Sequence, residues 1–132
     1  MTATTSPTQG VHHLGLTVPD LSASLRFFTD ALGYKKVGER PDYPAAFVTD
    51  GHTMLSIWQA KTASRATPFD RHHHLGLHHF ALLTTALDEL YHQLSQRQDT
   101  VIEFAPQPVG NGPARHMMCH IPGGLRLELI QP

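Results

Sequence analysis

The sequence has few of the features that mark secreted, nucleic-acid-binding or membrane proteins. Cysteine occurs once, at Cys119, so no disulfide forms within the chain and a cytoplasmic location is expected. Charged residues are 16% of the chain and the formal net charge is −1, without a basic stripe, so we expect no nucleic-acid partner. No apolar run is long enough for a membrane span, and the first residues lack the pattern of a signal peptide. The composition of these 132 residues is that of one globular domain with its own core.

Histidine, by contrast, is abundant, with 11 residues, and it occurs in a repeated context. His12-His13 stands before the apolar segment 14–18, and His78-His79 stands before the apolar segment 80–83. In each case a helix-like segment and three strand-like segments follow. The sequence therefore predicts two copies of one unit, at about 11–60 and 77–132.

The hydrophobic pattern of the first unit predicts a strand at 11–18, a helix, and strands at 34–39, 45–49 and 53–59. Asp20 or Ser22 is the expected N-cap of the helix and Gly33 its end, and Asp50-Gly51 is a hairpin turn.

The second unit predicts a strand at 77–83, a helix at about 85–97, and strands at 101–104, 115–121 and 125–130. A Pro/Gly loop at 105–113 and a polar connector at 61–74, with His72 to His74, complete the chain.

A single unit of this kind cannot bury its sheet face alone, which favours packing of the two units together. The predicted fold class is α+β, with tandem βαβββ units forming a curved mixed sheet around a metal-binding cleft. Residues 11–132 are expected to form the domain and residues 1–10 a mobile tail. Strand alternation places His13, His79, Ser56 and Glu128 on the face away from the core.

Two histidines and a glutamate are a typical ligand set for a divalent metal with open coordination positions. His13, His79 and Glu128 are the candidates, and iron, manganese, nickel, cobalt or zinc suits such ligands. The ion would polarise oxygens of a small substrate. A solvated Glu128 is the simpler alternative when this residue is taken alone.

These segments resemble the vicinal oxygen chelate superfamily, which includes glyoxalase I, fosfomycin resistance proteins, methylmalonyl-CoA epimerase, extradiol dioxygenases and bleomycin resistance proteins. The resemblance rests on the segments His13 to Val18, Arg26 to Tyr34 and Gly124 to Leu129, together with His79. It implies metal ligands at His13, His79 and Glu128. The fourth ligand position of the family holds Ser56, a poor ligand, which disfavours a glyoxalase I or epimerase activity and favours the types with three ligands.

The resemblance thus implies a metal-dependent enzyme, a dioxygenase or a lyase or isomerase, that chelates a small substrate through adjacent oxygens. The alternative is a metal-free protein of the bleomycin-resistance type that sequesters a small molecule.

Other residues are assigned by position. His116 and His120 share the strand parity of Met118, so either is a candidate acid-base group. Candidate substrate-binding residues are Ser56, Trp58, Met118 and Arg115. A dimer contact is an equal alternative for Trp58, and a surface position for Arg115. We expect a homodimer, in which the metal site is completed either within one chain or across two.

Overall fold

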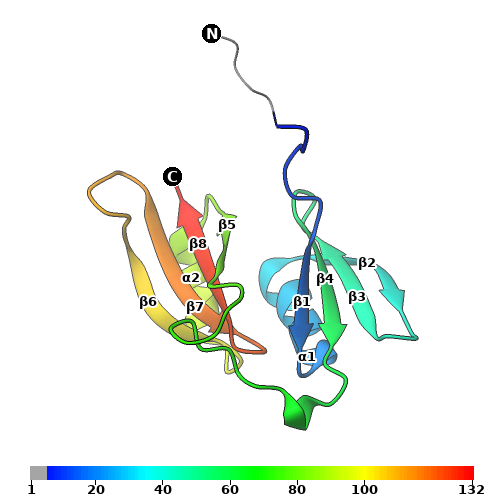
Figure 1. Ribbon diagram of the computed structural model, residues 1–132. Coiled ribbons are helices and arrows are strands. Elements are labelled where there is room, and N and C mark those ends of the chain that lie inside the picture. Colours follow the sequence, from blue (N-terminus) through cyan, green and yellow to red (C-terminus); the bar gives the residue numbers. More distant parts are fainter. Residues whose placement is uncertain (1–5) are drawn as a thin grey trace.

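The computed structural model describes residues 6–132 and contains two βαβββ modules (Figure 1). The first five residues of the expected tail lie outside the described residues. The first module consists of β1 (Leu14–Val18), α1 (Leu21–Arg26), η1 (Phe27–Ala31), β2 (Lys35–Arg40), β3 (Ala45–Thr49) and β4 (Met54–Gln59). The second consists of β5 (Phe80–Leu83), α2 (Leu87–Ser95), β6 (Val101–Pro108), β7 (Arg115–Ile121) and β8 (Leu125–Gln131). A polar connector with the short helix η2 (Ala63–Arg65) joins them.

The two sheets have the same topology, which confirms the tandem repeat. Their strand orders are β1-β4-β3-β2 and β5-β8-β7-β6, with the first two strands of each order parallel and the others antiparallel. Leu14 pairs with Leu55 in the first sheet, and Phe80 pairs with Leu127 in the second. Ser56 and Glu128 therefore occupy equivalent positions, and so do Met54 and Arg126.

The helix of the first module begins and ends where the sequence indicates. The Asp20 carboxylate accepts a hydrogen bond from the backbone N–H of Ala23 at 3.1 Å, as an N-cap does. Gly33 has φ +71°, a left-handed conformation that side chains disfavour and that ends the helix. Between them α1 continues into η1, a π-helical segment that buries Phe27 and Phe28.

The helices lie behind both sheets in Figure 1, so the open faces of both modules are turned to the same side of the molecule. The modules meet on the helix side, where the Arg97 guanidinium lies 5.7 Å from the centre of the Phe27 ring. In the β7–β8 turn, Gly123 lies against Val18 and Pro19. The buried side chains of both modules form a single hydrophobic cluster.

Several strand ends differ from the sequence prediction. β1 begins at Leu14 and β5 at Phe80, so His13 and His79 lie directly before the strands and not inside them. β6 extends to Pro108, beyond the expected end at Phe104. Its pairing with β7 continues past two register shifts, which accommodate residues that cannot pair regularly. No helix within residues 6–132 is long and apolar enough to cross a membrane.

Candidate functional site

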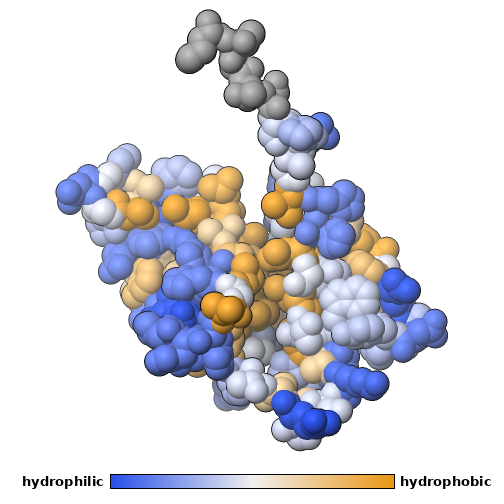
Figure 2. Space-filling view, in the orientation of Figure 1, coloured by the Kyte–Doolittle hydropathy of each residue, from blue (hydrophilic) through white to orange (hydrophobic). Residues whose placement is uncertain are grey.

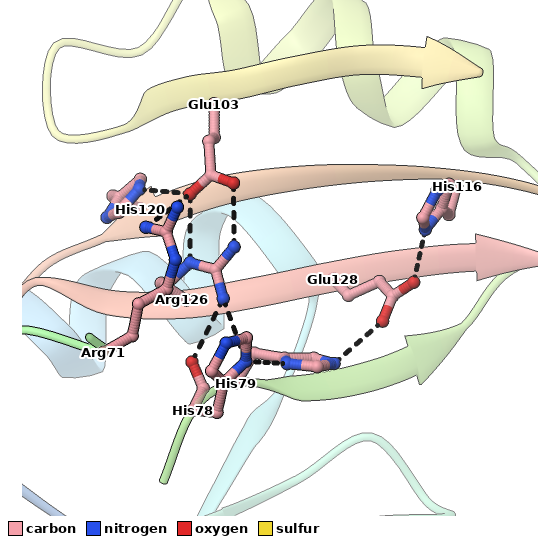
Figure 3. A network of polar contacts seen from close by, with 8 residues as sticks. All are labelled: Arg71, His78, His79, Glu103, His116, His120, Arg126 and Glu128. Atoms are coloured by element: carbon pink, nitrogen blue, oxygen red, sulfur yellow. Dashed lines mark hydrogen bonds and ion pairs between the residues drawn. The ribbon is translucent and has the colours of Figure 1, made fainter. Parts of the chain in front are cut away.

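A carboxylate held between two imidazoles marks the open face of the second module (Figure 3). Glu128 projects from β8, His79 precedes β5, and His116 lies on β7. Nε2 of His79 is 3.1 Å from Oε1 of Glu128, and Nδ1 of His116 is 2.5 Å from Oε2. The two rings thus contact different oxygens of one carboxylate.

This group is partly shielded from water. The side chains of Glu128 and His116 are 13% and 18% exposed, whereas that of His79 is 33% exposed. Met118, the cross-strand partner of Glu128, is buried, and the Phe104 ring lies 4.9 Å from that of His116. Such an arrangement has the donor atoms for a metal at His79 and Glu128, and a short path for a proton between Glu128 and His116.

A second polar group, which the sequence analysis missed, lies on the same face. The Arg126 guanidinium donates to both oxygens of Glu103, from Nε at 3.0 Å and from Nη2 at 2.8 Å. His120 contacts Glu103 at 2.9 Å, so it lies in this group and not beside Glu128. The hydrogen bonds from Arg126, against a smaller opposing effect of burial, lower the pKa of Glu103 to about 2.

Arg126 also connects this group to the His78-His79 pair. Its Nη1 lies 3.1 Å from Nδ1 of His78 and 3.3 Å from the His78 carbonyl oxygen. Nδ1 of His78 is in turn 2.8 Å from Nδ1 of His79. Desolvation, followed by the positive charge of Arg126, lowers the pKa of His78 below its usual value.

His13, the third candidate ligand, belongs to the other module. It is exposed, and its Nδ1 lies 2.9 Å from Nδ1 of His12. The structure therefore brings together His79 and Glu128 but does not place His13 with them in one chain. Among the described residues, no three His, Cys, Asp or Glu side chains are grouped closely enough to hold a metal ion.

The open face of the first module is built differently, from small and aromatic residues. A shallow pocket of about 460 Å³ is lined by Gly15, Thr17, Arg40, Tyr43 and Trp58. The indole N–H of Trp58 donates to Oγ of Ser56 at 3.0 Å. Ser56 is buried beneath the indole, so it is not available as the substrate-binding residue that the sequence analysis expected.

The rim of this pocket is aromatic and carries a positive charge. The Tyr43 ring lies 4.8 Å from that of Trp58, and the Arg40 guanidinium lies 5.9 Å from the centre of the indole.

Figure 2 shows hydrophilic side chains gathered over the second module, and hydrophobic ones where the two modules meet.

Arg115 does not lie with the candidate site. Its guanidinium makes a bidentate ion pair, at 3.0 Å for both contacts, with Asp88 of α2. Since α2 covers the other face of the sheet, Arg115 points away from Glu128. The histidines at 72–74 are exposed, and all three contact Asp70 of the connector.

The comparisons with known proteins give the family. The profile of the Glyoxalase/Bleomycin resistance protein/Dioxygenase superfamily matches residues 10–129. The chain belongs to this superfamily. No curated protein compared with the chain matches it.

Solved structures of this superfamily share the fold over nearly the whole chain. A glyoxylase/bleomycin resistance protein/dioxygenase domain from Frankia sp. EAN1pec is 24% identical, with a TM-score of 0.77 and coverage of 94% of this chain and 92% of that one. A lactoylglutathione lyase from Agrobacterium tumefaciens is 24% identical, with a TM-score of 0.71 and 96% coverage of both chains. The fosfomycin resistance protein FosX from Listeria monocytogenes is 15% identical, with a TM-score of 0.72 and coverage of 95% and 94%. At these identities the likeness concerns the fold.

Proposed function

We propose that the protein is a divalent-metal-dependent enzyme of the glyoxalase superfamily that acts on a small substrate with adjacent oxygens. The observation that carries the proposal is the contact of 3.1 Å between Nε2 of His79 and Oε1 of Glu128 on the open face of a superfamily fold. An imidazole nitrogen and a carboxylate oxygen are donors that iron, manganese, nickel, cobalt and zinc accept. A bound ion of this kind supplies a Lewis acid that stabilises negative charge on a substrate oxygen.

The third ligand in this proposal is His13 of a second copy of the chain. Within one chain His13 lies on the other module, but the open faces of both modules are turned to the same side. Two copies packed face to face by a twofold axis set the first module of each chain opposite the second module of the other. The strands β1 and β5, which His13 and His79 precede, are both at sheet edges and free for such a contact.

The remaining residues of the site have separate tasks. His116, at 2.5 Å from Oε2 of Glu128, is placed to hold a proton beside the substrate and to pass it on. The pocket around Trp58 offers a flat apolar wall, and Arg40 at its rim offers a positive charge. We infer that the substrate has an aromatic or apolar body.

We infer the reaction class from Ser56, the residue of β4 that pairs with Gly15 of β1. Ser56, at the position equivalent to Glu128, is buried and bonded to Trp58, so it leaves the metal with three protein ligands. A three-ligand site keeps positions open for two substrate oxygens and one further ligand, which suits a dioxygenase or a lyase or isomerase.

The alternative, a metal-free protein that sequesters a small molecule, is favoured by one observation. The lining of the Trp58 pocket includes neither His79 nor Glu128, so contact with an aromatic compound there would require no metal ligand. The two functions differ in whether the ligand requires the metal.

Elemental analysis of protein purified without metal affinity resins separates these functions. We expect about one iron, manganese, nickel, cobalt or zinc ion per chain. We also expect its loss in each of His13→Ala, His79→Ala and Glu128→Ala. The matched control is His52→Ala, an exposed histidine of the β3–β4 turn, which keeps the metal. Metal-free wild-type protein that binds aromatic compounds equally well in all variants would contradict the enzyme and leave a sequestering protein.

A further inference from the structure

We propose that Arg126 and His78 are positioning residues that fix the tautomer of His79, with its proton on Nδ1 and its Nε2 directed at Glu128. The inference deepens the proposed function, because Nε2 is the atom that would bind the metal. It follows from the chain of contacts that runs from Glu103 to Glu128 in Figure 3.

The first step concerns the arginine, whose orientation is fixed. Arg126 is 8% exposed, and Glu103 accepts hydrogen bonds from both its Nε and its Nη2. This leaves Nη1 directed at His78, with 3.1 Å to Nδ1 and 3.3 Å to the carbonyl oxygen. A guanidinium only donates hydrogen bonds and does not lose its proton in proteins.

The second step gives the protonation of His78. Because Nη1 of Arg126 presents a hydrogen to Nδ1 of His78, this nitrogen has to be the acceptor and carries no proton. Nδ1 of His78 also lies 2.8 Å from Nδ1 of His79. Of these two nitrogens only that of His79 is left to donate, so the proton between the rings belongs to His79.

The third step follows from the chemistry of imidazole. A neutral ring protonated at Nδ1 has its lone pair on Nε2, which here lies 3.1 Å from Oε1 of Glu128. Without a metal this carboxylate favours a hydrogen on Nε2, so the contact between Nδ1 of His79 and Nδ1 of His78 has to oppose it. In the protonated ring Nδ1 still carries its proton, and only Nε2 exchanges a proton for a metal ion. Orientation of a ligating histidine through its other nitrogen is a general way to raise metal affinity.

The first module provides an internal comparison. His12 and His13 make the same contact between Nδ1 atoms, at 2.9 Å. The residue equivalent to Arg126 is Met54, which has no hydrogen to donate. Nothing in this contact determines which histidine is the donor, so the tautomer of His13 is not fixed in the same way.

The test uses substitutions at exposed His78, which leave the core intact. In His78→Asn the amide oxygen can replace Nδ1 as acceptor, whereas His78→Leu removes it, and His12→Leu is the matched control. The tautomer is read by nitrogen-15 NMR of histidine-labelled, metal-free full-length protein at about pH 8.5, about two units above the ordinary imidazole pKa.

We expect His79 to carry its proton on Nδ1 in wild type, in His78→Asn and in His12→Leu, and to become a mixture of tautomers in His78→Leu. The double variant Glu103→Gln with Arg126→Met, which removes both charges together, should give a mixture as well. A His79 proton on Nε2 in wild type, or an unchanged tautomer in both His78→Leu and the double variant, would overturn the proposal.

Titration with zinc alone gives the functional consequence. We expect His78→Leu to weaken zinc binding by about 10- to 100-fold and His78→Asn to restore most of it. Equal weakening in both His78 variants would contradict the positioning role. Failure of wild type to bind zinc or the other candidate metals would refute the metal enzyme but leave the NMR result to decide the tautomer.

Discussion

The neighbours of Trp58 determine which part of its indole is accessible to a ligand. Its indole N–H is already bonded to Ser56, so the ring offers a ligand only its aromatic surface. Gly15 keeps that surface accessible, since a Cβ atom at this position would lie 3.2 Å from Oγ of Ser56 and 3.8 Å from the indole nitrogen. We therefore expect the pocket to prefer flat apolar bodies, which it would hold by contact area rather than by hydrogen bonds to the indole.

This selection is testable with two probes that share vicinal hydroxyl groups. We predict that the metal-loaded protein binds catechol more tightly than cyclohexane-1,2-diol, and that Trp58→Leu removes about 1 kcal/mol of that preference. Isothermal titration calorimetry measures both affinities. Phe69→Leu, which removes an aromatic side chain of the connector, serves as the control. A preference for catechol that Trp58→Leu leaves unchanged would show that Trp58 does not line the substrate site.

Strand β6 shows where an element departs from what its sequence indicates. The register of β6 against β7 shifts between Ile102 and Phe104, so Glu103 is an extra residue at a bulge. The bulge lets Glu103 reach Arg126 on the open face while Phe104 also contacts His116 there. Period-two alternation predicts the faces of β8 well, but a bulge depends on the partner strand and leaves no local pattern.

The ion pair between β6 and β8 should be visible in the pH dependence of stability. The pKa of Glu103 is about 2 in the folded protein against an ordinary value of 4.5. The stabilisation is therefore complete above pH 4.5 and is lost as the pH falls through about 2.

We predict that Glu103→Gln lowers the free energy of unfolding by about 2 kcal/mol at pH 7, because Arg126 is buried and loses its charged partner. The difference from wild type should narrow steadily below pH 4.5. Urea unfolding over this pH range measures it, with Glu39→Gln, an exposed ion-pair residue, as a control without measurable effect. A difference that does not vary with pH would rule out the ion pair as its source.

At the scale of the whole chain, the sequence predicts the two modules but not how they are arranged. The repeated strand and helix patterns predict both modules and the positions of His79 and Glu128 on an open face. They do not predict how the modules pack, because that depends on contacts between distant side chains such as Arg97 and Phe27. The placement of His13 away from Glu128 within one chain follows from this packing, as does the need for a second copy in the proposed site.

Mixing two variants that each lack one proposed ligand tests the proposed shared metal site most directly. His13→Ala and Glu128→Ala are unfolded together in equal amounts and refolded, so that mixed dimers form. A site built across two chains is intact once in each mixed dimer, and we predict that the mixture regains about a quarter of the wild-type metal sites. Each variant refolded alone regains none. If the mixture also binds no metal while size measurements show mixed dimers, the three ligands do not come from two chains and the proposed site is wrong.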